Sequence, residues 1–121
     1  MEQAVAREAA AFAARGGDPF FVWASFVNPH PPLFPPDEFH ALFEGRDLLL
    51  RGSLEQDEPG LLSFLAQRRA NQGLRELERD ALLGITRAYY ASLAWTDHCI
   101  GELLSALDRA GLTGSTLVIY T

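Results

Sequence analysis

The chain has 121 residues, of which 48% are apolar and 21% are charged, values typical of one globular domain rather than a disordered segment. Its formal net charge of −6 argues against nucleic-acid binding, which usually requires a basic surplus. The longest apolar run is far shorter than the roughly 18 residues that indicate a membrane span, so none is predicted. A single cysteine, Cys99, excludes an internal disulfide.

The first predicted element is a helix over residues 3–15. The segment is rich in alanine, the best helix former, and Val5, Ala9, Phe12 and Ala13 fall on one face. The glycine pair at 16–17 is expected to end it.

A buried strand is predicted over residues 20–27. This segment, FFVWASFV, is aromatic and β-branched without polar alternation, which is typical of a strand buried on both faces of a parallel sheet.

A stiff loop follows at residues 28–36, which hold five of the seven prolines. Proline is excluded from helix interiors and central strands, so this loop must leave the carboxyl end of the first strand. Asp37 and Glu38 then begin a short helix that runs through Phe43, and a second short helix is predicted over residues 61–69.

The clearest periodic signal predicts a long helix over about 77–110. Apolar residues recur there at steps of three and four, and Gly111 followed by Leu112 indicates a Schellman-type end. A second apolar strand is expected over about 116–121, within the sequence STLVIYT at 115–121. The positions that recur along the predicted long helix are Leu82, Ile85, Tyr89, Leu93, Thr96, Ile100, Leu103 and Leu107.

The order of these elements predicts an α/β fold with two parallel strands, 20–27 and 116–121, joined through the proline-rich loop and the long helix. A connection of this kind is a right-handed crossover. Two strands that are apolar on both faces cannot cover themselves. We therefore expect a piece of a larger α/β domain, or a chain that needs a partner to supply further strands.

Asn28 and His30 are the leading candidates for a site, because ligands of open α/β sheets bind beyond the carboxyl ends of the strands. Flanking prolines restrict the backbone around His30, and a histidine there can donate a hydrogen bond to an anionic substrate or protonate a leaving group. The alternative interpretation is that the loop carries a histidine without a role.

The remaining polar residues give weaker signals. His40 is expected on the surface of the short helix, and Asp97 is expected to make a structural hydrogen bond. His98 and Cys99 are adjacent on a helix, so their side chains diverge by about 100° and do not readily share a metal ion. No pair of residues has structural zinc spacing, and no metal ligand is predicted in this chain.

Two segments together suggest a family. Residues 19–39, PFFVWASFVNPHPPLFPPDEF, resemble the sulfatase segment in which Pro-Phe-Phe and an apolar strand precede Pro-His-x-Pro and a proline-rich loop. Residues 85–121 are similar to the sulfatase helix that contains Arg-x-Tyr-Tyr-x-Ser and Asp-x-x-Ile-Gly, followed by Gly-Leu and a strand ending in Thr. The stretch 41–78 between them is not diagnostic.

The resemblance implies that residues 1–121 are an internal part of a sulfatase catalytic domain, in the α/β sandwich of the alkaline phosphatase superfamily. Sulfatases hydrolyse sulfate esters with a formylglycine nucleophile, made from the Cys of Cys-x-Pro-x-Arg, and a bound calcium ion. His30 corresponds to the histidine of the Pro-His-x-Pro loop, so it is expected to contact the sulfate ester and to assist the leaving group. Asn28 is expected to help bind the substrate.

The departures from the family pattern are as informative as the matches. Cys99 is followed by Ile-Gly-Glu, so it is not the modified cysteine, and the calcium ligands and the nucleophile are expected outside this chain. The chain alone is therefore predicted to be inactive. Two alternatives stay open: a related phosphonate monoester hydrolase or phosphodiesterase, or a non-catalytic module that is compact by itself.

Overall fold

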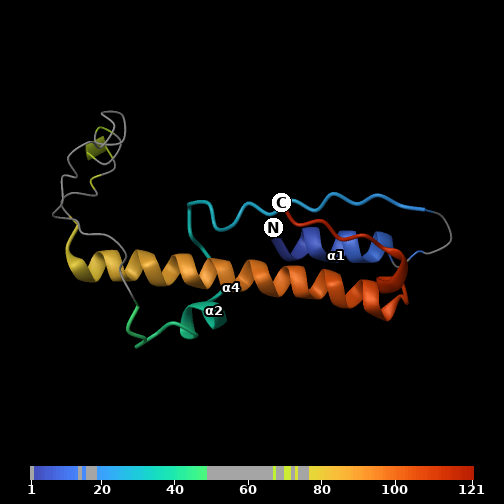
Figure 1. Cartoon of the computed structure of the whole chain (residues 1–121). Helices are drawn as coiled ribbons and strands as arrows, with labels where there is room; N and C mark the ends of the chain where they lie inside the picture. The colour runs from blue at the N-terminus through green and yellow to red at the C-terminus, as the bar shows by residue number, and fades with distance from the viewer. Residues whose placement is uncertain are drawn as a thin grey trace.

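The computed structural model describes residues 2–13, 15, 19–48, 67, 70–71, 73 and 77–121. Its helices are α1 (Glu2–Ala13), α2 (Asp37–Ala41), α4 (Arg79–Arg109) and the short 3₁₀-helix η2 (Thr113–Ser115). Figure 1 shows α1 lying along the C-terminal half of α4, and α2 lying against α4 closer to its middle.

The long helix confirms the prediction from periodicity, since α4 begins two residues later and ends one residue earlier than expected. Its 31 residues extend about 47 Å at 1.5 Å per residue. The predicted stop is also confirmed. Gly111 has a φ of 70°, and the backbone N–H of Leu112 donates to the carbonyl of Leu107 at 3.0 Å, which is the Schellman pattern.

Small side chains form the contact between α1 and α4. Ala6 and Ala13 of α1 are 0% and 2% exposed, and Cys99 and Ala106 in the C-terminal half of α4 are 0% and 8% exposed. Small residues let two helix backbones approach closely, so this core contains few large side chains. The helix predicted over 3–15 is confirmed as α1, although Phe12, which was expected on its buried face, is 46% exposed.

The prediction of two parallel strands is wrong, and with it the prediction of an α/β fold for this chain. None of the described residues lies in a strand, and segments 20–27 and 116–121 carry no ladder of hydrogen bonds. Both segments are extended: residues 21–27 alternate between exposed and half-buried, as an extended chain does when one side rests on a surface.

The physical reason lies in what an apolar, β-branched pattern encodes. It records a preference for extended backbone and for burial, but a strand also needs a neighbour to accept its N–H groups. Here segment 20–27 instead runs antiparallel along α1, with the Phe20 ring 6.4 Å from Phe12 at one end and the Val27 N–H on Glu2 at the other (Figure 1). Its outward-facing side chains are exposed to solvent, Phe21 by 81% and Trp23 by 79%.

Helix α2 follows the proline-rich loop and is anchored on α4 by aromatic side chains. The Phe39 ring lies 5.5 Å from the His98 ring, and Phe43 stacks on Tyr90 at 5.8 Å. The helix ends at Ala41 and residues 42–45 form turns, so the predicted run through Phe43 is two residues too long. The predicted glycine stop at 16–17 lies outside the described residues, as does the helix over 61–69 apart from residue 67.

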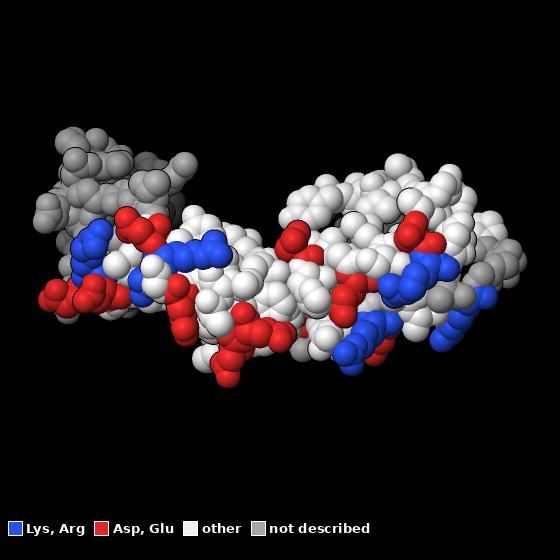
Figure 2. Space-filling view, turned by 90° about the horizontal axis from the view of Figure 1, so that it is seen from below, with Lys and Arg blue, Asp and Glu red and all other residues white. Residues whose placement is uncertain are grey.

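The surface carries mixed charge. On the face in Figure 2, basic side chains lie mainly toward the two ends with acidic side chains between them, and the described part of that face has no continuous basic patch. Within the described ranges, no helix combines the length and the apolar character needed to cross a bilayer.

Candidate functional site

The candidate site is a tight turn formed by residues 27–30, directly after the extended segment. The backbone N–H of His30 donates to the carbonyl of Val27 at 3.0 Å and closes the turn. The Asn28–Pro29 and Pro31–Pro32 peptide bonds are cis. The turn leaves His30 exposed and Asn28 half-buried, so the two predicted site residues lie together at one corner of the molecule.

The hydrogen bonding of His30 defines which ring nitrogen is free. Its Nδ1 lies 2.6 Å from the carbonyl oxygen of Pro31. A carbonyl oxygen can only accept, so Nδ1 carries the hydrogen and donates it. The other nitrogen, Nε2, is left to act as an acceptor when the ring is neutral and as a donor when it is protonated.

Glu2 holds the turn from below, and sequence reasoning missed it. Its Oε1 accepts from the backbone N–H of Val27 at 3.3 Å and from the side-chain Nδ2 of Asn28 at 2.9 Å. Oε2 accepts from the same Val27 N–H at 3.3 Å, and the Asn28 backbone N–H lies 3.4 Å from Oε1. One acidic residue in the first turn of a helix is common, and no signal in the sequence links it to a loop 25 residues away.

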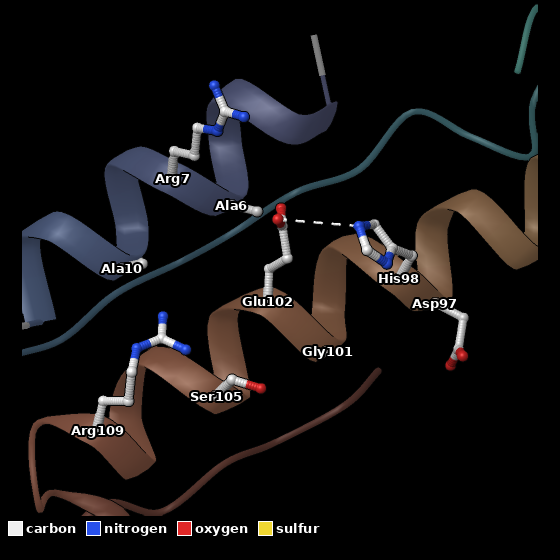
Figure 3. Close-up of a pocket in the computed structure, with 9 residues that line it drawn as sticks. All are labelled: Ala6, Arg7, Ala10, Asp97, His98, Gly101, Glu102, Ser105 and Arg109. Carbon is white, nitrogen blue, oxygen red and sulfur yellow. Dashed lines mark ion pairs between the residues drawn. The ribbon is translucent and has the colours of Figure 1, made fainter. Parts of the chain in front are cut away.

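A separate hollow of about 450 Å³ lies between α1 and α4 and is lined by Arg7, His98, Glu102 and Arg109, among others (Figure 3). His98 Nε2 lies 3.8 Å from Glu102 Oε1. Neither Asn28 nor His30 lines this hollow, so it is distinct from the turn. Asp97 also borders it and is exposed.

Comparison with known proteins decides the family. A statistical model of the sulfatase family matches residues 1–121. The chain belongs to the sulfatase family. This confirms the resemblance of residues 19–39 and 85–121 on which the family was predicted.

Several curated proteins, including sulfatases, are similar to this chain. An arylsulfatase of Clostridium perfringens is 30% identical over 110 residues, which cover 84% of this chain and 21% of that protein. Human iduronate 2-sulfatase is 28% identical over 115 residues, covering 85% of this chain and 21% of that protein. The multifunctional alkaline phosphatase superfamily protein PehA of Trinickia caryophylli is 22% identical over 120 residues, covering 88% of this chain and 23% of that protein. No solved structure matches.

The sulfatase chain therefore spans about a fifth of the length of these curated relatives. Family membership is established by the match across the whole chain, whereas activity and substrate belong to the longer relatives. The turn at 27–30 and the prolines that follow it lie within the matched residues.

The one cysteine of this sulfatase chain is not an activated nucleophile. Cys99 is fully buried in α4, and burial, followed by the nearby Glu102 and Glu2 carboxylates, raises the pKa of its thiol. A thiol with a raised pKa stays protonated and unreactive near neutral pH. Among the described residues, no group of three or more His, Cys, Asp or Glu side chains is arranged to hold a metal ion.

Proposed function

We propose that this chain is part of a sulfuric ester hydrolase in which His30 and Asn28 contact the sulfate ester. The observation that carries the proposal is the free Nε2 of an exposed, hydrogen-bonded His30 in a chain that matches the sulfatase family throughout. Relatives named arylsulfatase and choline-sulfatase support sulfate esters as the substrate class.

The chemistry follows from the hydrogen bond between Nδ1 and the Pro31 carbonyl. That bond keeps the donor hydrogen on Nδ1, so protonation of the ring places the second N–H on Nε2, where it faces solvent. Protonated His30 can donate to the bridging oxygen of the ester as its bond to sulfur breaks, and the proton leaves with the alcohol or phenol. Asn28 keeps one side-chain N–H beyond the one taken by Glu2, and this group can donate to a sulfate oxygen.

A calcium ion and a formylglycine are part of the proposal only for the longer protein. Calcium would supply charge neutralisation at the sulfate oxygens, and formylglycine would supply the nucleophile. The described residues of this chain do not fit either group, because they hold no cluster of potential metal ligands and Cys99 is buried inside a helix. We infer that the chain alone does not turn over a sulfate ester.

A phosphonate or phosphate ester is the second candidate substrate, favoured by the similarity to a protein described as a multifunctional member of the alkaline phosphatase superfamily. The His30 ring would serve either substrate, because sulfate, phosphonate and phosphate esters all present tetrahedral oxyanions and a bridging oxygen. The two candidates differ in the charge of the bound anion and therefore separate in a binding experiment.

The test is an NMR titration of the 121-residue chain with 4-nitrophenyl sulfate at constant ionic strength. The chain has three histidines, so His40 and His98 act as internal controls for the ring signals of His30. We expect the His30 ring signals to shift saturably, with no release of 4-nitrophenol. Equal shifts at His40 or His98, or none at His30, would contradict the proposal, and a stronger response to 4-nitrophenyl phenylphosphonate would favour the second candidate.

A further inference from the structure

We propose that Glu2 is a positioning residue for the site: its buried carboxylate fixes the turn at residues 27–30 and thereby the orientation of Asn28 and His30. The inference rests on the proposed function, because it assigns Glu2 a role through the residues that contact the ester.

Burial is the first reason. Glu2 is only 1% exposed, whereas glutamate is among the residue types that are almost never fully buried unless paired. An ionised carboxylate pays a large desolvation penalty, which is offset only by hydrogen bonds or opposite charge. Glu2 also lies in the first turn of α1, where the helix dipole favours a negative charge. A buried acid at this place needs donors, and the turn provides them.

The geometry of those donors is the second reason. Three N–H groups converge on one carboxylate: the backbone amides of Val27 and Asn28 and the side-chain amide of Asn28. The same residue, Val27, accepts the hydrogen bond from the His30 backbone that closes the turn. Glu2 therefore fixes the first two residues of the turn, and the turn's own hydrogen bond carries that constraint to His30.

The third reason concerns the Asn28 side chain. Because a carboxylate only accepts, the Asn28 amide must direct Nδ2 toward Glu2, at 2.9 Å, and its Oδ1 away. Without Glu2 the amide could rotate and present either end to an anion. With Nδ2 held by Glu2, its second N–H remains the Asn28 side-chain donor for a sulfate ester, whereas a rotated amide would place the acceptor Oδ1 there.

The test compares Glu2→Gln with Glu8→Gln in the full 121-residue chain. Both substitutions remove one negative charge from α1, but Glu8 is exposed. Gln at position 2 keeps one acceptor and opposes the Val27 and Asn28 amides with its own N–H groups. We expect Glu2→Gln to weaken the binding of 4-nitrophenyl sulfate, measured at the His30 ring, about tenfold or more, because charge-assisted hydrogen bonds are lost. Glu8→Gln should bind as the wild type does.

A purely structural role for Glu2 predicts something different. In that case Glu2→Gln would lower the free energy of unfolding in urea but leave the ester affinity of the folded chain unchanged. That outcome would overturn the inference. If Glu2→Gln does not fold, Glu2→Asp replaces it: the charge stays but the reach shortens, and an ester affinity equal to wild type would again refute a positioning role.

The inference and the proposed function fail in distinguishable ways. If the wild-type His30 ring does not respond to the ester, the proposed function fails. The positioning role of Glu2 is then tested by the ¹⁵N shifts of the His30 ring, which report whether Nδ1 keeps its hydrogen. Loss of that preference in Glu2→Gln but not in Glu8→Gln supports the positioning role, and an unchanged preference refutes it.

Discussion

Gly111 and Gly101 offer a prediction in which one substitution, glycine to alanine, has opposite effects at two places ten residues apart. Gly111 ends α4 with a φ of 70°, a conformation that costs a residue with a Cβ about 1–2 kcal/mol. Gly101 lies inside α4, where alanine is favoured over glycine by roughly 0.5–1 kcal/mol. A Cβ added at either position meets no atom within 4 Å, so packing does not contribute.

The free energy of unfolding should therefore fall by about 1 kcal/mol or more in Gly111→Ala and rise by up to about 1 kcal/mol in Gly101→Ala. Urea titrations followed by helical circular dichroism measure both values under the same conditions. Gly111→Asn is the intermediate case, because asparagine tolerates the left-handed conformation better than alanine. Equal changes in Gly111→Ala and Gly101→Ala, or a stabilising Gly111→Ala, would refute the assignment of the Schellman end.

Two further predictions concern the contact between α1 and α4. Ala6→Leu adds three carbons at a fully buried position and should lower the free energy of unfolding by about 1–3 kcal/mol. The control Ala4→Leu, on the exposed side of α1, should change the free energy of unfolding by less than about 0.5 kcal/mol. Equal urea midpoints for the two variants would contradict the packing of α1 on α4. Stability should also decline above pH 9.0, the ordinary pKa of cysteine, because the folded chain keeps the Cys99 proton while the unfolded chain loses it. One proton limits the Cys99 contribution to at most about 1.4 kcal/mol per pH unit, and this contribution should be absent in Cys99→Ala; identical pH profiles of the two chains would refute it.

The sequence predicted the helical part of the fold well because the signals involved are local. The apolar periodicity of α4 and the glycine that ends it act within a few residues of one another, and both were identified. Which face of α4 is buried was harder to predict. Ile85 and Tyr89 belong to the apolar repeat but are 46% and 43% exposed, because α1 covers the C-terminal half of α4.

The two strands could not be settled from sequence because pairing depends on neighbours that are distant in the chain. Segment 20–27 is extended as expected, yet Phe21 and Trp23 face outward, and the Val27 amide donates to Glu2 rather than to a neighbouring strand. The apolar pattern predicted that the side chains of this segment are buried on both faces. In the described part of the chain, Phe21 and Trp23 stay exposed.

The candidate site was predictable in part. The prolines around Asn28 and His30 predicted a stiff loop after an apolar segment, and the structure has a tight turn at residues 27–30. The contact of Glu2 with the turn was not predictable, because it joins residues 25 positions apart. The alanine-rich sequence of the helix also does not indicate that Glu2 is buried.

The central claim is that His30 acts on a sulfate ester within a sulfatase. Its most direct test is the hydrolysis of 4-nitrophenyl sulfate by the longest reading frame that contains these 121 residues, with His30→Gln compared against His40→Gln. We predict turnover by the wild type, a loss of about 10²–10⁴-fold in kcat for His30→Gln, and an unchanged rate for His40→Gln. A His30→Gln variant as active as the wild type would contradict the account.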